Sequence, residues 1–234
     1  MTGADGVMSQ VGLMAGLRSP VPPRDLASCL QYIVEGVETS GLLEVVVGRA
    51  HAPGGYAWVF PKGPGMAEVG LGITRDLGHA IVGRGHDARW HLERFMSESF
   101  MRARFARARI VEVQGGGVPL AAAHKHMAAD NLILVGDAAR QVNPITGGGI
   151  HTALRSGRMA GQFLGQALPA APAASRAALK GYHDLWHAEL GHALAELYQM
   201  KTAIFAEADP DRQDAALYQT LSSYFLPDSR FKRV

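Results

Sequence analysis

The sequence has very little cysteine, almost no net charge and no long apolar run, and each absence excludes a class of protein. A single cysteine, Cys29, rules out an internal disulfide framework and is typical of a reducing compartment, so we expect a cytoplasmic protein. A formal charge of +2, from 23 basic and 21 acidic side chains, indicates no nucleic-acid partner. No stretch approaches the ~20 apolar residues of a membrane-spanning helix, and residues 1–17 lack the pattern of a signal peptide. Any membrane contact is expected to be peripheral, at the inner face of the membrane.

The most informative segment is residues 131–150, where a short apolar run leads into a Gly-Asp pair and then into three glycines. The run at 133–135 predicts a buried strand. Gly136 permits a sharp turn, and Asp137 then stands at the carboxyl end of the strand, where a carboxylate can accept hydrogen bonds from sugar-like hydroxyls. A helix that starts near Gly148 offers unpaired N–H groups and a positive dipole end. This arrangement favours an anionic, hydroxyl-rich cofactor, and it suits a flavin ring that gathers negative charge on reduction.

A second segment alternates aromatic residues at period two. Tyr56, Trp58 and Phe60 are expected to share one face of a strand, and Gly70 and Gly72 follow on the next strand. Missing side chains at these glycines permit close approach of a backbone or a ligand. The pattern is consistent with a slot for a flat ring or a long apolar chain, with ordinary sheet packing as the alternative.

These segments resemble those of the geranylgeranyl reductase family, within the flavoproteins related to aromatic hydroxylases. Residues 136–150 are similar to the family's Gly-Asp-Ala-Ala-x-Gln-Val-Asn-Pro-x-Thr-Gly-Gly-Gly-Ile, and the segment that begins at residue 53 is similar to its Pro-Gly-Gly-Tyr-x-Trp-x-Phe-Pro-Lys-Gly. Residues 3–11 resemble a third family segment, Gly-Ala-Asp-Gly-x-x-Ser-x-Val. Fifteen residues of mixed chemistry seldom match by chance, so the resemblance is specific.

The resemblance implies FAD as the cofactor. It implies that Asp137 bonds the ribityl chain and that Gly149 and Ile150 present backbone groups to the flavin ring. The implied cofactor-binding residues are Asp5, Gly6, Gly136, Asp137, Pro144, Gly147, Gly148, Gly149 and Ile150. The implied substrate-binding residues are Tyr56, Trp58, Phe60, Gly70 and Gly72. No catalytic acid is assigned.

We expect a mixed fold of the α+β and α/β classes, with a partial parallel FAD-binding sheet, an antiparallel substrate-domain sheet and C-terminal helices. Four apolar stretches between residues 28 and 74 favour the antiparallel sheet. The expected parts are residues 1–23, a remnant of the FAD-binding domain with its linker; 24–126, the substrate domain; 127–168, the return of the FAD-binding domain; and 169–234, a helical segment. Further expected elements are a helix over 87–100, strands over 110–113 and 118–120, and a helix over 150–168.

One family feature is not found in the sequence. The Gly-x-Gly-x-x-Gly turn, which lies between a strand and a helix and binds the pyrophosphate, does not occur near the N-terminus. We therefore expect the chain to be the C-terminal part of a two-domain flavoprotein, either as a fragment or with a partner chain that completes the fold.

The resemblance implies an enzyme that reduces carbon–carbon double bonds in the prenyl chains of lipids, quinones or chlorophyll, with NADPH, ferredoxin or a quinol-linked donor as reductant. Two alternatives remain open: a flavin-dependent monooxygenase or halogenase of the same fold, and a non-catalytic remnant.

A zinc-protease motif is the one competing pattern. His183 and His187 stand four residues apart, so they would share a helix face. The acid between them is Asp184 rather than the longer Glu of that motif, and His192 is misplaced for the extended form. We therefore expect no metal site.

Overall fold

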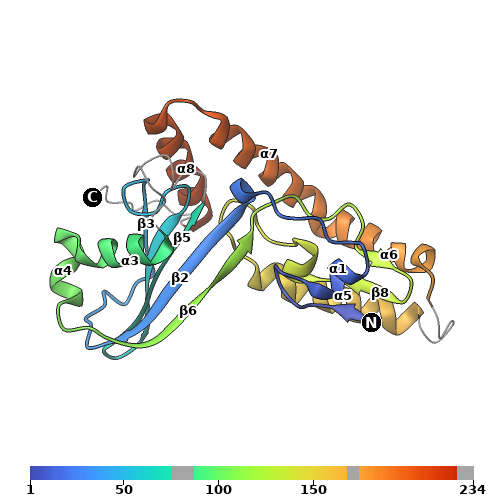
Figure 1. The fold of residues 1–234 in the computed structure, drawn as a ribbon, viewed down its shortest axis with the longest axis horizontal. Helices are drawn as coiled ribbons and strands as arrows, with labels where there is room; N and C mark the ends of the chain where they lie inside the picture. The colour runs from blue at the N-terminus through green and yellow to red at the C-terminus, as the bar shows by residue number, and fades with distance from the viewer. Residues whose placement is uncertain (75–86, 168–173, 226–234) are drawn as a thin grey trace. The chain divides into compact units, whose positions relative to one another are not determined.

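The computed structural model describes residues 1–74, 87–167 and 174–225. The chain folds into two compact units (Figure 1). The first, the small-sheet unit, comprises Met1–Asp25 and Val118–Ala203. The second, the large-sheet unit, comprises Leu26–Gly117 and the chain from Ile204 onward. Each unit thus joins segments that are far apart in the sequence.

The small-sheet unit contains a three-stranded sheet in the order β1-β8-β7. Strand β1 (Thr2–Gly3) is parallel to β8 (Leu132–Leu134), whereas β7 (Ala128–Ala129) is antiparallel to β8. Every residue of β8 is apolar and buried, as expected for a strand that is covered on both faces. The other elements are α1 (Gln10–Met14), the 3₁₀ turns η1 (Pro23–Asp25) and η2 (Gly136–Ala139), α5 (Ile150–Ala167), α6 (Arg176–Trp186), the π-helical turn η4 (His187–Gly191) and α7 (His192–Ala206).

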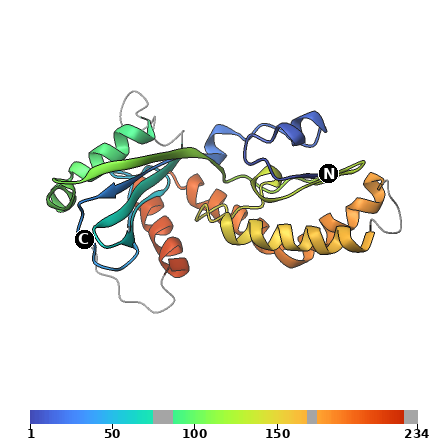
Figure 2. The same cartoon turned by 90° about the horizontal axis from the view of Figure 1, so that it is seen from below.

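The large-sheet unit contains a five-stranded sheet in the order β3-β4-β5-β2-β6. Its strands are β2 (Leu26–Glu35), β3 (Glu44–Val47), β4 (Tyr56–Gly63), β5 (Met66–Thr74) and β6 (Arg109–Pro119). Its helices are α3 (Ala88–Ser97), α4 (Ser99–Phe105) and α8 (Pro210–Phe225). Helices α3 and α4 lie over one face of the sheet, and α8 lies on the opposite side (Figure 2).

Strand alternation decides which side chains form the core of the large-sheet unit. Ala57 and Val59 of β4 and Leu71 of β5 point toward α3, where they pack with Leu92 and Phe95, and all five side chains are buried. The intervening residues of β4 therefore belong to the opposite face. The antiparallel sheet expected between residues 28 and 74 is confirmed.

Two details differ from the expected elements. The helix expected over 87–100 begins at Ala88, because the Asp87 carboxylate accepts a hydrogen bond from the Trp90 N–H at 2.9 Å and caps the helix. The separate strands expected around Gly115 are one strand, β6, because this glycine allows the chain to pass close to β2: a Cβ at Gly115 would lie 3.2 Å from Leu30 Cδ1.

The compact units also divide the chain differently from the expected parts. Residues 118–126 belong to the small-sheet unit, and the C-terminal segment divides between the units after Ala203. Leu168, the expected last residue of the helix that starts at Ile150, lies outside the described residues. Within the described ranges, no helix combines the length and the apolar character needed to cross a membrane.

A buried ion pair anchors α7 within the small-sheet unit. Lys201 Nζ donates to Asp25 Oδ1 at 2.6 Å and to the Leu120 carbonyl at 2.8 Å, and the Tyr198 hydroxyl donates to Asp25 Oδ2 at 3.1 Å. The two charged side chains are only 4% and 5% exposed, and burial lowers the pKa of Lys201. Such a pair is tolerated only because further hydrogen bonds satisfy both groups.

We expect the Lys201→Met substitution to lower the free energy of unfolding by about 3 kcal/mol, because it leaves the Asp25 carboxylate buried without its cation. The matched control is Lys180→Met, which removes the same charge from an exposed pair with Asp184. Water already screens that pair, so the control should unfold at nearly the wild-type urea concentration. Equal urea midpoints for the two variants would contradict this assignment.

Candidate functional site

The turn after β8 is the centre of the candidate site. Gly136 adopts a left-handed conformation with φ 62°, which lets the chain leave the strand sharply, and η2 follows directly. The loop then folds around Asn143, whose Oδ1 accepts hydrogen bonds from the N–H groups of Ile145 at 2.9 Å and Thr146 at 3.1 Å. Pro144 is buried in this loop. The loop therefore holds its shape through its own hydrogen bonds.

Asp137 is the unsatisfied group of this turn. Its side chain is half-buried, and no group in the described part of the chain donates a hydrogen bond to its carboxylate. Burial accordingly raises the pKa of Asp137. A Cβ at Gly149 would lie 3.1 Å from Asp137 Oδ1, so the glycine allows the loop to return beside the carboxylate. A half-buried carboxylate that the protein does not hydrogen-bond fits a ligand that brings hydroxyl donors.

Helix α5 supplies donors next to this carboxylate. It begins at Ile150, directly after the three glycines, and its first turn carries no acidic side chain that would neutralise the dipole. The start of this helix is accessible, since the Ile150 side chain is 83% exposed. The Gly148 N–H donates a hydrogen bond to Thr146 Oγ1 at 3.1 Å, so it is already used. The remaining free N–H groups of the first turn are the donors that a ligand would meet.

The N-terminal segment reaches the same edge of the small sheet. Gly3 pairs in parallel with Leu134, so the turn at Asp5 and Gly6 and the turn at Gly136 follow their strands at corresponding positions. The Asp5 carboxylate is already occupied: Oδ1 accepts from Ser9 Oγ at 2.6 Å and Oδ2 from the Val11 N–H at 3.0 Å. The hydrogen bond from Ser9 lowers the pKa of Asp5. Asp5 thus holds α1 in place, and its contact with a cofactor remains a prediction.

Gln141 is a residue that the sequence analysis did not identify. Its side chain is fully buried, and its Oε1 accepts a hydrogen bond from the Gly136 N–H at 2.7 Å. Its Nε2 donates to the Tyr182 hydroxyl of α6 at 3.1 Å. The Trp186 Nε1, one turn further along α6, donates to Ser156 Oγ of α5 at 3.0 Å. These bonds connect the turn that carries Asp137 to both helices.

The aromatic residues share one face of the large sheet, as predicted. The ring centroids of Tyr56 and Trp58 lie 5.7 Å apart, and those of Trp58 and Phe60 lie 6.1 Å apart. The ring centroid of Phe225 in α8 lies 5.6 Å from that of Tyr56, so α8 covers part of this face. Burial raises the pKa of Tyr56 to about 12 and that of the neighbouring Cys29 to about 11, so both groups are neutral at pH 7.

The two glycines opposite these aromatic rings play different parts. Gly70 pairs with Trp58, and a Cβ at Gly70 would lie 2.6 Å from Trp58 Cζ2 and 2.5 Å from Gln31 Cβ. The space above Gly70 is therefore filled by the indole, whose Nε1 donates to Gln31 Oε1 at 3.3 Å. A Cβ at Gly72 would meet only Cys29 Sγ, at 3.1 Å. Contact of either glycine with a substrate remains a prediction, and at Gly70 the indole already fills the space.

The three histidines of α6, η4 and α7 lie in sequence along one side of the helical segment, with their rings close together. The rings of His183 and His187 lie 5.8 Å apart, and those of His187 and His192 lie 4.4 Å apart. No group of three or more potential metal-ligating side chains occurs among the residues that the structure describes.

We expect Gln141→Leu to destabilise the small-sheet unit by about 2 kcal/mol, because it leaves the buried Gly136 N–H and Tyr182 hydroxyl without partners. Urea unfolding measures this loss. Gln162→Leu makes the same change at an exposed position of α5 and should have almost no effect. Wild-type stability in Gln141→Leu would show that the turn does not depend on this side chain.

Comparison with known proteins identifies one family model and several reductases that this chain resembles. Residues 25–118 match the family model described as the geranylgeranyl reductase catalytic domain. The chain is 35% identical over 233 residues to the digeranylgeranylglycerophospholipid reductase of Methanosarcina mazei, covering 99% of this chain and 54% of that protein. It is 38% identical over 217 residues to digeranylgeranylglycerophospholipid reductase 2 of Methanopyrus kandleri. This match covers 91% of this chain and 52% of that protein. The chain spans about half the length of these relatives.

Solved structures are similar to this chain as well. A geranylgeranyl bacteriochlorophyll reductase-like protein from Thermoplasma acidophilum is similar with a TM-score of 0.80 and 28% identity, over 97% of this chain and 59% of that one. A probable FAD-dependent monooxygenase from Pseudomonas aeruginosa shares the fold with a TM-score of 0.59 and 22% identity, over 93% of this chain and 58% of that one. The family model, the two reductases and the Thermoplasma acidophilum structure thus all make this chain similar to geranylgeranyl reductases over the part of those proteins that it spans.

Proposed function

We propose that this chain binds FAD through residues 136–150 and forms part of a reductase that saturates isolated carbon–carbon double bonds in the prenyl chains of lipids. The observation that carries the proposal is the Asp137 carboxylate, which is half-buried at the carboxyl end of β8, beside the start of α5, and accepts no hydrogen bond from the residues that the structure describes. The names of the reductases that the chain resembles support the choice of reaction and of a prenyl lipid.

The residues of the loop fit a flavin. The Asp137 carboxylate would accept hydrogen bonds from ribityl hydroxyls, and the free N–H groups at the start of α5 would face the part of the ring that becomes negative on reduction. Gly149 would keep this approach clear of side chains. When bound, FAD supplies hydride for reduction of the double bond.

The aromatic face of β4 would position the substrate. Tyr56, Trp58 and Phe60 lie side by side on one face of β4, and Gly72 pairs with Tyr56 at one end of this row without adding a side chain. An isolated double bond has no polar handle, so a prenyl chain must be oriented by shape and apolar contact. Tyr56 and Cys29 add no charge to this surface, because burial raises the pKa of both.

Three further points extend the proposal. A nicotinamide or ferredoxin is the proposed reductant, and contact with a membrane that holds the lipid is proposed to be peripheral. Oxygen-dependent chemistry is the alternative activity, since a flavin-dependent halogenase and a monooxygenase share the fold, although at identities of 17% and 22% they show the fold alone. Product formation without oxygen distinguishes reduction from both.

The first test concerns Asp137. We expect Asp137→Ala to weaken binding of FAD and of riboflavin by about tenfold to a hundredfold, because ribityl hydroxyls lose a charged acceptor. Riboflavin retains the ribityl chain without the pyrophosphate, so it reports on this end of the site alone. Flavin fluorescence during titration measures both affinities.

The control for this test is Glu196→Ala, which removes an exposed carboxylate of α7. Wild-type affinity should also fall as the pH drops through the raised pKa of Asp137, since protonation removes the acceptor, and Asp137→Ala should lack this pH dependence. Unchanged riboflavin and FAD affinity in Asp137→Ala would exclude Asp137 from the flavin site.

The second test concerns Trp58. We expect Trp58→Ala to retain FAD but to lower kcat/KM for a prenyl substrate at least tenfold, because a large apolar wall is removed. Trp90→Ala makes the same truncation on α3, on the core side of the sheet, and should leave kcat/KM nearly unchanged. If Trp58→Ala loses FAD and prenyl turnover in equal measure, Trp58 serves the fold rather than the substrate.

A further inference from the structure

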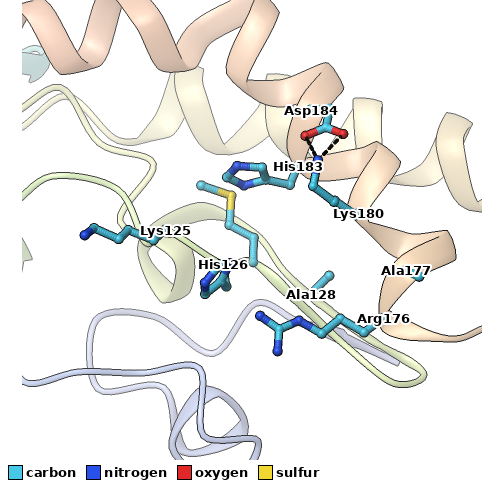
Figure 3. A pocket seen from close by; sticks show the side chains of 9 residues that line it. Lys125, His126, Ala128, Arg176, Ala177, Lys180, His183 and Asp184 are labelled. Atoms are coloured by element: carbon cyan, nitrogen blue, oxygen red, sulfur yellow. Dashed lines mark hydrogen bonds and ion pairs between the residues drawn. The ribbon is translucent and has the colours of Figure 1, made fainter.

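A cavity of about 540 Å³ lies in the small-sheet unit, between the segment that leads into β7 and the first turns of α6 (Figure 3). Its floor is apolar: Met127 and Ala128 are buried there, and Ala177 adds a methyl group from α6. Five of its lining side chains are basic or imidazole groups, namely Lys125, His126, Arg176, Lys180 and His183. None of them belongs to the flavin loop or to the aromatic face.

The basic side chains that line this cavity are not all neutralised by acidic side chains of the same cavity. Asp184 is the only acidic residue among the described residues that line it, and both oxygens of that carboxylate accept hydrogen bonds from Lys180 Nζ at 2.8 Å. Arg176 uses its backbone N–H to donate to Asp130 Oδ1 at 2.6 Å, but its guanidinium has no acceptor among the described residues. The Lys125 ammonium likewise has none in the described part of the chain. His183 Nδ1 is buried without a partner there.

A second cavity, of about 500 Å³, adjoins the first. The two cavities share Lys125, His126 and Arg176, so the boundary between them consists of basic side chains only. Figure 3 shows the Arg176 guanidinium reaching back from α6 toward His126. The acid that lines the second cavity, Asp25, is held by Lys201 at 2.6 Å and cannot neutralise this boundary.

We propose that this shared rim binds the phosphate group of an organic phosphate whose apolar body lies over Met127 and Ala128. A guanidinium without an acceptor forms paired, charge-assisted hydrogen bonds to phosphate oxygens, and Lys125 adds a mobile point charge beside it. The apolar floor accounts for an organic body rather than a bare ion. The proposal is independent of the flavin and prenyl assignments, because it uses none of their residues.

The test is calorimetric titration of the full chain at low salt with glycerol 3-phosphate, inorganic phosphate and, as the uncharged comparison, glycerol. We expect both phosphates to bind and glycerol not to bind. Arg176→Gln should weaken phosphate binding about tenfold, since one charge-assisted contact is lost. Arg158→Gln removes an exposed arginine of α5 outside both cavities and should bind as the wild type does.

Lys125→Gln provides a second variant, expected to weaken phosphate binding less than Arg176→Gln because it removes a single mobile charge. Circular dichroism establishes that each variant is folded. The proposal is overturned if the wild-type chain binds neither phosphate, or if Arg176→Gln and Arg158→Gln bind phosphate equally well.

Sedimentation with vesicles then identifies the source of the phosphate. If the proposed group belongs to a lipid, phosphatidylglycerol vesicles should bind the wild-type chain more strongly than phosphatidylcholine vesicles, and Arg176→Gln should lose that preference. If it belongs to a soluble molecule, glycerol 3-phosphate binds and the vesicles do not. Vesicle binding that is the same in wild type and Arg176→Gln, without binding of soluble phosphate, would contradict a site at this rim.

Discussion

The candidate flavin site depends on one buried amide. Gln141 holds the Gly136 N–H with its oxygen and the Tyr182 hydroxyl with its nitrogen, so the turn after β8 cannot move independently of α6. Asp137 is the next residue along the chain, and the direction of its carboxylate follows from that turn. In a flexible turn the carboxylate would turn toward water and form hydrogen bonds there. A ligand would then have to displace that water, and its binding would be weaker. The polar network is fully buried and fully paired, which is the condition under which such networks make a structure rigid.

Local sequence patterns were sufficient to predict the parts of the fold that depend on neighbouring residues. The apolar run of β8, the glycine turn and the helix start at Ile150 were predicted because each follows from residues within one turn of the chain. The alternation of Tyr56, Trp58 and Phe60 similarly predicted their common face. Gln141 could not be identified in this way, since its partner Tyr182 lies 41 residues away, and an amide in a loop has no periodicity that marks it.

Sequence patterns were insufficient where packing between distant segments decides the outcome. Gly70 and Gly72 were both predicted to permit close approach of a backbone or a ligand, and the register of β4 against β5 puts the Trp58 indole directly over Gly70. The glycines around Gly115 indicated a break between two strands, whereas they allow a single strand to pass close to β2. In both cases glycine provides room for a neighbouring part of the same chain. Sequence alone predicts that room is needed but cannot say which group fills it.

The close contact between Trp58 and Gly70 also means that the residue at one of these positions limits which residues the other can hold. Any side chain at position 70 would meet the indole at 2.6 Å, and it would meet Gln31 Cβ from the other side at 2.5 Å. The glycine therefore cannot be replaced while the Trp58 ring and the Gln31 side chain keep their positions. A larger residue at position 70 therefore needs compensating changes at both Trp58 and Gln31. The width of the apolar surface would then change only through coordinated substitutions rather than one residue at a time.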